Sequence, residues 1–521
     1  MAEYLHHSVL WRILRVIAGF FSSMVEGSLV VAAWKSSVFR RGIFGFLKSD
    51  DGLSRGSVPG KALRILDGKL AGWQGLGRAV HSSVFGRLSA ALLRSCRNSR
   101  IVGVLFRRGI TGVILALLGI YAGFDWLLRD VLAIPVVSAI WDEALLILAF
   151  VWVLWKRTDK KSPTLIRTTN LDFAVLGFVC LCLCLMIARS PDTGIAVAGY
   201  RAVCQYLLWF FVVVRLLRSD VDCKQLYYTM VLLATIIGLH GVYQYIVGTP
   251  IPDTWTDAAE ADVRTRSFSI FGSPNILASY MVMFAPMAAG LAYATKNWKM
   301  KVLAWGITLI MCACCLFTMS RGGWVAMAVA VVVFALLVDR RLFVLVLVAG
   351  VVALFLPFVR SRLGYVFTDE FAESTAKGGR AIRWEIGLQH LRDSSPLFGF
   401  GLGRFGGAVA MQNQVLPIDY FYMDNYYMKT LVEIGYVGLS GFIFMMLSLV
   451  LTGCRSLYQS KQVKHGDMFP MASGIFAGLC GVLAHCYFEN IFEEPYMMAS
   501  FWILAAMLVY MGILRNRKQK I

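Results

Sequence analysis

Arginine, histidine and aspartate side chains gather in one long polar segment of an otherwise apolar chain. Residues 360–425 lie between two hydrophobic stretches and contain Arg380, Arg383, His390 and Asp424. Arginine is the side chain best suited to forked binding of phosphate, and Asp or His can accept a proton from a hydroxyl group. We therefore expect a reactive centre in this segment, with Arg383 beside the reacting bond and Asp424 or His390 as the base.

The same residues allow plainer interpretations. Asp424 and Asn425 begin a predicted span, and an aspartate at such a place is often only the N-cap of the helix. Pro396 ends a predicted amphipathic helix that carries Arg380 and His390. The glycines of GFGLGRFGG, which follow Pro396, could bring backbone amides to a phosphate or act as a flexible hinge.

Three further arginines lie near the predicted outer ends of other hydrophobic spans. Arg201 lies a few residues inside its span, Arg321 belongs to TMSRGGW, and Arg266 precedes SFSIFGSPN. A single arginine at such a place can simply reach lipid phosphate, but several outward arginines oppose the usual bias of basic residues toward the cytoplasm. Together with Arg380 and Arg383, they are predicted to bind an anionic ligand.

Four more polar residues are candidates for lining the same outward cavity. Asn425 and Glu433 belong to the start of one predicted span, and His485 and Glu489 stand four residues apart near the outer end of the next. They could face the cavity or merely pair with one another. No metal site is predicted, because the 12 cysteines lie mostly in apolar runs, where they are expected to pack as small apolar residues.

The composition indicates a membrane protein. Of 521 residues, 58% are hydrophobic and only 16% are charged, which is not the composition of a soluble protein of this length. Apolar runs long enough to cross a bilayer predict an all-α membrane protein with about 12 transmembrane helices. They lie at about 111–128, 131–155, 171–188, 195–215, 226–247, 273–295, 301–318, 322–338, 342–359, 426–453, 470–488 and 496–514.

The basic residues predict how these helices are oriented. The formal net charge is +20, and Lys and Arg follow every second span, whereas most acidic loops and the 360–425 segment follow the others. By the positive-inside rule, both termini are cytoplasmic and the 360–425 loop is extracytoplasmic. The basic excess does not predict nucleic-acid binding, because no folded basic domain is visible.

The chain divides into two parts. Residues 1–110 are a basic extension, which we interpret as amphipathic helices on the lipids of the inner membrane surface or as a segment with one weak extra span at 13–34. Residues 111–521 are the polytopic membrane domain.

The order of several motifs resembles a known family. RSFSIFGSPNILASYM, TMSRGGWVAM, GGRAIRWEIGLQHLRDSSPLFGFGLGRF and DNYYMKTLVEIGYVGL follow one another and are similar to the O-antigen ligase family, which includes ligases, polysaccharide polymerases and O-oligosaccharyltransferases. The resemblance covers about residues 111–515. It implies a GT-C-like polytopic bundle and a glycosyltransferase of the bacterial inner membrane. Such an enzyme moves a glycan from an undecaprenyl-diphosphate carrier to a glycan, lipid or protein acceptor on the outer face, without a cofactor or metal.

By position, the resemblance implies that Arg201, Arg321, Arg380 and Arg383 bind the donor diphosphate. Many family members have His before Asn where this chain has Asp424. A carboxylate can still act as the base, as in the carboxylate-dependent cell-wall polymerases of related fold, so the resemblance does not decide between ligase and polymerase. Two other functions stay open: a small-anion transporter of the same sequence family, and a non-catalytic envelope assembly partner.

Overall fold

The computed structural model describes most of the chain from residue 109 onward. Among the described residues there are helices and turns but no strand, so the predicted all-α polytopic fold is confirmed for them. Most of the 1–110 extension and parts of the 360–425 loop lie outside the described residues. Apart from a few isolated positions, the described residues are 58–73, 109–158, 167–189, 191–250, 265–355, 359–360, 380–416, 422–463 and 468–519.

Ten of the described helical segments are long and apolar enough to cross a membrane. They are α12 (Pro135–Arg157), α13 (Asn170–Arg189), α14 (Thr193–Cys204) continued by α15 (Leu208–Leu216), α16 (Asp220–Val247), α17 (Pro274–Ala294), α18 (Trp298–Phe317), α19 (Arg321–Val338), α25 (Tyr426–Gln462), α26 (Met468–His485), and α27 (Pro495–Val509) continued by η8 (Tyr510–Leu514) and α28 (Arg515–Gln519).

Two predicted spans differ from the structure. In place of a straight helix at 111–128, α10 (Gly109–Gly119) is followed by α11 (Tyr121–Trp126) and η1 (Leu127–Val131), and the two halves are bent by 77°. The helix α20 (Arg341–Leu354) has 14 residues, which is shorter than a membrane span. The described residues therefore give ten spans, or eleven if the bent pair crosses the membrane.

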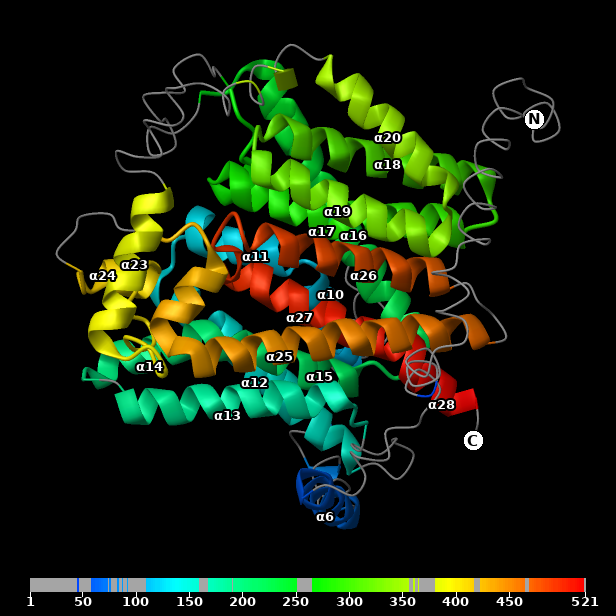
Figure 1. Cartoon of the computed structure of the whole chain (residues 1–521). Helices are drawn as coiled ribbons and strands as arrows, with labels where there is room; N and C mark the ends of the chain where they lie inside the picture. Colours follow the sequence, from blue (N-terminus) through cyan, green and yellow to red (C-terminus); the bar gives the residue numbers. More distant parts are fainter. Residues whose placement is uncertain are drawn as a thin grey trace.

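Close backbone contact holds the centre of the bundle together. A Cβ atom on Gly478 of α26 would lie 2.2 Å from the carbonyl oxygen of Met283 in α17, and one on Gly474 would lie 2.4 Å from that of Pro286. Small residues at such contacts are how membrane helices approach each other without a hydrophobic driving force. Figure 1 shows α26 and α27 in the middle of the bundle, with α18 and α20 on one side and α12 and α13 on the other.

The predicted amphipathic helix is present as α23 (Arg380–Ser394), which lies with α24 (Ala408–Gln412) at one end of the bundle (Figure 1), here called the loop end. The helical spacing of Ala381, Trp384, Leu388 and Leu391 predicts that they form its apolar face. In the structure the buried residues are Gly387 and Leu391, whereas Ala381 and Leu388 are exposed. The reason is steric: a Cβ on Gly387 would lie 2.9 Å from the Phe405 ring. The glycine lets α23 rest directly on the loop and α25.

Candidate active site

Asp424 is buried where the large loop enters α25, and both arginines of α23 reach it. Its Oδ2 accepts a hydrogen bond from Arg380 Nε at 2.5 Å and lies 3.5 Å from an Nη atom of Arg383. Its Oδ1 is buried and has no hydrogen-bond partner among the described residues. The carboxylate thus has one oxygen held by two cations and another, buried oxygen that makes no hydrogen bond to the described residues.

The N-cap of α25 is Asn425, not Asp424. The Asn425 side chain accepts a hydrogen bond from the backbone N–H of Met428 at 3.0 Å. The plainer interpretation, that Asp424 only caps a helix, therefore does not hold. Because Asn425 occupies the capping position, the Asp424 carboxylate is left to pair with the arginines of α23.

Backbone carbonyls fix the two guanidinium groups. Arg380 donates to the carbonyl oxygen of Phe488 at 2.9 Å, and Arg383 donates to that of Tyr422 at 3.3 Å. The two side chains nevertheless remain 47% and 33% exposed. A guanidinium that is fixed in direction but still reaches solvent is suited to bind an anion that arrives from outside.

The end of α26 and the turn that follows it add two buried titratable residues beside these arginines. His485 Nδ1 lies 2.5 Å from Ser279 Oγ, and Glu489 Oε2 accepts a hydrogen bond from Asn275 Nδ2 at 2.5 Å. Burial raises the pKa of Glu489 above its ordinary value. The side chains of His485 and Glu489 are thus tied to α17 and not to each other.

Arg321 begins α19 beside the same turn. A Cβ on the next residue, Gly322, would lie 2.6 Å from Phe488 Cβ. Because Phe488 also accepts the hydrogen bond from Arg380, the start of α19 is close to the arginines of α23. The structure therefore brings Arg321 to the end of the bundle where Arg380 and Asp424 meet.

A buried ion cluster lies one turn into α25. Lys429 Nζ is 3.1 Å from Glu433 Oε2 and 2.9 Å from Glu493 Oε2, and the three side chains are at most 9% exposed. Phe405 and Ala408 of the large loop donate backbone hydrogen bonds to the two glutamates. Burial opposes the charge of Glu493, but Lys429 outweighs it and holds its pKa below the ordinary value. Glu433, predicted to line the cavity, therefore belongs to a cluster that fastens the loop to α25.

The glycine-rich loop is paired with a break in α25. Gly435 has φ +67° in the middle of that helix, a conformation that frees backbone groups for other partners. The freed groups bond to the loop, so this part of the loop is attached to α25, and the amides of Gly399 and Gly401 are already used in backbone hydrogen bonds. The bonds run from Phe400 N to Val432 O, from Gly401 N to Glu433 O, from Tyr436 N to Pro396 O and from Val437 N to Leu397 O, at 2.7 to 3.1 Å.

Residues 306–443 match the family model described as O-antigen ligase. The resemblance to the O-antigen ligase family is confirmed. The matched segment runs from α18 into α25 and contains Arg321, Arg380, Arg383 and Asp424. No curated protein matches the chain.

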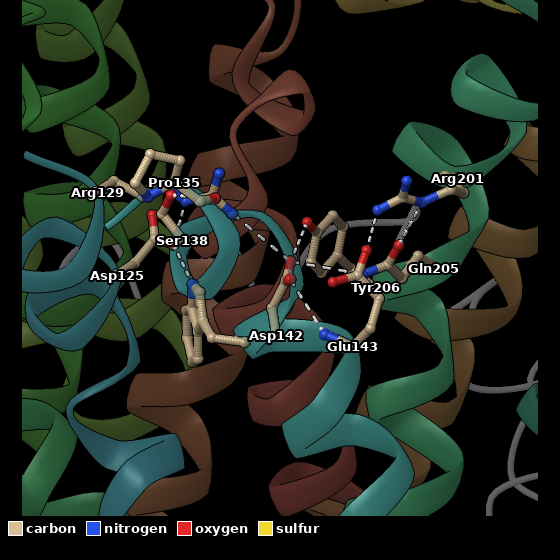
Figure 2. A network of polar contacts seen from close by, with 10 residues as sticks. Asp125, Arg129, Pro135, Ser138, Asp142, Glu143, Arg201, Gln205 and Tyr206 are labelled. Atoms are coloured by element: carbon tan, nitrogen blue, oxygen red, sulfur yellow. Dashed lines mark hydrogen bonds and ion pairs between the residues drawn. The ribbon is translucent and has the colours of Figure 1, made fainter. Parts of the chain in front are cut away.

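Arg201 lies outside the O-antigen ligase segment, and its guanidinium pairs with Glu143 of α12. Figure 2 shows this pair with the neighbouring Gln205. Arg201 therefore belongs to a second cluster of polar contacts, here called the Asp142 network. The network consists of Asp125, Arg129, Trp141, Asp142, Glu143, Arg201, Gln205 and Tyr206.

Two other predicted site residues, Arg266 and His390, make contacts within the fold. Arg266 is buried, and its Nε donates to the carbonyl oxygen of Thr318 at 3.0 Å, which ties the segment before α17 to the end of α18. The His390 ring packs 5.3 Å from the ring of Phe400 and lies seven residues beyond Arg383, about 10 Å along the helix axis. Asp424, and not His390, is the candidate base that contacts both Arg380 and Arg383.

Sequence reasoning missed Lys429, Glu493 and most of the Asp142 network. A signal was present, because Lys429 stands four residues before Glu433 in an apolar stretch. Opposite charges at this spacing share a helix face, and charges at membrane depth require partners. The adjacent acids Asp142 and Glu143 within a predicted span carried the same signal.

Proposed function

We propose that the chain is a glycosyltransferase of the bacterial inner membrane that transfers or polymerises a glycan from an undecaprenyl-diphosphate-linked donor on the outer face. One observation carries the proposal. Asp424 has one oxygen on Arg380 and Arg383 and the other without a partner, inside the segment that matches O-antigen ligase. The acceptor is a hydroxyl group of a glycan, lipid or protein, and both termini lie in the cytoplasm.

In the proposed reaction, the donor diphosphate binds to Arg380 and Arg383, with Arg321 nearby at the start of α19. The bond between the anomeric carbon and the diphosphate oxygen breaks, and undecaprenyl diphosphate leaves with the bonding electrons. Arginine side chains already held in place stabilise the charge that develops on this leaving group. Their hydrogen bonds to backbone carbonyls support this role, because little reorganisation is needed.

The acceptor supplies the other half of the reaction. Its hydroxyl oxygen attacks the anomeric carbon from the face opposite the diphosphate, and its proton passes to Oδ1 of Asp424. One C–O bond forms as one breaks, so the anomeric configuration inverts. Asp424 then releases the proton to water and is ready for another cycle.

Replacing the two central residues tests this mechanism. Asp424→Asn removes the proton acceptor while keeping the shape, and we expect product formation to fall by about 10²- to 10⁴-fold. Arg383→Ala should lower it by about 10²- to 10³-fold. The matched controls are Asp393→Asn and Arg392→Ala, which alter exposed residues of the same α23 helix and should retain activity.

The assay uses purified full-length protein in lipid with an undecaprenyl-diphosphate-linked oligosaccharide and measures released undecaprenyl diphosphate. Full activity of both Asp424→Asn and Arg383→Ala would remove the mechanism. Uptake of a small anion into liposomes that contain no lipid-linked donor would favour the transporter alternative instead.

We also propose that residues 1–110 form a cytoplasmic extension on the membrane surface. The helix α6 (Val58–Gly72) supports this, because Asp67 accepts two hydrogen bonds from Arg157 at the end of α12, at 2.6 and 2.9 Å. Ile65 and Leu66 of α6 are exposed, as expected for a helix that lies on lipid. For a non-catalytic assembly partner, deleting residues 1–100 would reduce surface glycan more than Arg383→Ala does.

A further inference from the structure

A cavity of about 540 Å³ lies at the loop end, between α11 and η1, which follow the bend after α10, the short η5 helix (Ser269–Phe271) and the start of α27. It shares Asp125 and Arg129 with the Asp142 network, and neither residue is used in the proposed reaction. Its size is that of a typical small-molecule pocket. The cavity therefore has room for a ligand that the Asp424 site does not account for.

The polar lining mixes hydrogen-bond acceptors and donors. Asp125, Asp130 and Glu494 contribute carboxyl groups, and Arg129 and His240 contribute N–H groups. Burial raises the pKa of Glu494 to about 7, so near neutral pH this carboxyl group can either donate or accept. An excess of acids over the single arginine disfavours a phosphate ligand.

A metal ion is also a poor fit, because no three His, Cys, Asp or Glu side chains converge for one in the part of the chain that the structure describes. The lining suits an uncharged ligand with many hydroxyl groups, each of which donates and accepts a hydrogen bond.

Aromatic rings supply the apolar part of the lining. The rings of Phe271 and Tyr496 stack with centroids 4.8 Å apart, and Trp126 remains 37% exposed at the cavity wall. A sugar ring has an apolar C–H face and a rim of hydroxyl groups, so flat rings beside carboxyl groups match both of its surfaces. This combination distinguishes a sugar from a lipid chain, which would leave the carboxyl groups without partners.

The backbone of the cavity wall is irregular. The α10–α11 pair is bent by 77°, and Ser269 has φ +49°, held by a hydrogen bond from its amide to Gln244 Oε1 at 2.7 Å. In membrane proteins, broken helices are tolerated where they line a cavity, and strained residues concentrate at binding sites. Both irregularities agree with a binding role for this wall.

We infer that this cavity binds an uncharged sugar unit of the acceptor glycan, an assignment that rests on the proposed function. The cavity and the Asp424 site adjoin one short turn: Glu494 lines the cavity, Glu493 holds the loop amide of Ala408, and Glu489 lies beside Arg380. The donor sugar is joined to its diphosphate and so stays with the arginines. The cavity across the turn is thus left for the acceptor, whose hydroxyl group extends to Asp424.

Binding of simple glycosides tests the assignment without the enzymatic reaction. The probes are methyl glycosides of glucose, galactose and N-acetylglucosamine, measured by saturation-transfer NMR on the full-length protein in lipid nanodiscs. We expect at least one probe to bind, and its affinity to fall at least tenfold in Trp126→Ala and in Asp130→Asn. The matched controls, Trp298→Ala and Asp393→Asn, replace exposed residues outside the cavity and should bind normally.

Asp424→Asn separates this assignment from the proposed reaction, because it should lose product formation and keep glycoside binding. The assignment is overturned if no probe binds, if binding survives both cavity variants, or if only Asp424→Asn abolishes it. Loss of inorganic pyrophosphate binding in Trp126→Ala would also overturn it, because the cavity would then be the diphosphate site. If Asp424→Asn kept full activity while the cavity variants lost glycoside binding as expected, the proposed reaction would be wrong but the sugar site would stand.

Discussion

Asp424 and Asp142, the central aspartates of two polar clusters with similar residue types, differ in how their carboxylates are used. Asp424 has one oxygen on two arginines and one without a partner among the described residues. In the Asp142 network, Asp142 accepts hydrogen bonds at both oxygens, from the Glu143 amide and from the Tyr206 hydroxyl group, which is 2.7 Å away. Figure 2 shows the acids of this network facing partners on neighbouring helices.

The difference between these two aspartates separates a group suited to proton transfer from one that holds helices together. Glu143 Oε2 of the network is also buried without a hydrogen-bond partner among the described residues, so the contrast concerns Asp142 and not every acid around it. A buried polar group with every bond satisfied stabilises the packing of its helices, whereas a buried oxygen without a partner is costly and is kept where a reaction or ligand uses it. Arginine and aspartate content alone therefore does not mark an active site. Four experiments test this division.

The largest expected effect is on the reaction. Asp424→Asn should lower product formation by about 10²- to 10⁴-fold, whereas Asp142→Asn should leave it within about tenfold, because Asp142 has no part in proton transfer. Both are measured with the lipid-linked donor at saturating acceptor. Equal losses in the two variants would erase the distinction between the regions.

Lys429→Ala should produce the largest loss of stability. It leaves Glu433 and Glu493 buried without their cation, and breaking a buried ion pair in this way costs about 3–5 kcal/mol. We expect a clearly lower melting temperature in detergent and release of the loop from α25. An unchanged melting temperature would show that the cluster does not hold the loop.

Asp142→Ala should destabilise the protein by about 1–3 kcal/mol, because the Tyr206 hydroxyl group loses its buried partner. The double variant Asp142→Ala with Tyr206→Phe should recover part of that loss. A melting temperature measured in the same detergent checks both. No recovery in the double variant would mean that Asp142 acts through other contacts.

Arg201→Ala should have the smallest effect. The Arg201 side chain is 57% exposed and pairs with Glu143, and exposed ion pairs contribute about 0–1 kcal/mol. We expect a similar melting temperature and activity within a fewfold of the unaltered protein. A loss as large as that of Arg383→Ala would return Arg201 to the diphosphate site that the family resemblance implies.

Local spacing predicted part of the candidate site well. Arg380 and Arg383 are three residues apart on one helix, so they share a face whatever the helix packs against. The order of motifs around them was enough to indicate the O-antigen ligase family. Asp424 could be named from its place at a helix start, but only its neighbour's role as the N-cap shows that its carboxylate is not needed there.

Other features depend on how helices rotate against one another, which hydropathy does not report. The charge bias of the loops predicts on which side of the membrane Arg201 lies. Its pairing with Glu143, however, depends on how α12 and α14 are placed against each other. Likewise, a single glycine in an apolar run does not reveal a break, and Gly435 adopts φ +67° next to a loop that supplies its hydrogen bonds. The bend after α10 is hidden for the same reason.

The interruption at Gly435 has a mechanical consequence. It divides α25 into a short N-terminal part, residues 426–434, and a longer C-terminal part. Hydrogen bonds and the Lys429 cluster fasten the N-terminal part to the loop. Asp424 directly precedes this N-terminal part of α25, and α23 packs against the same part. Because the loop also bonds to Tyr436 and Val437 after the break, it clamps the two parts of α25 at a fixed angle, and this angle sets the direction in which Asp424 faces Arg380 and Arg383.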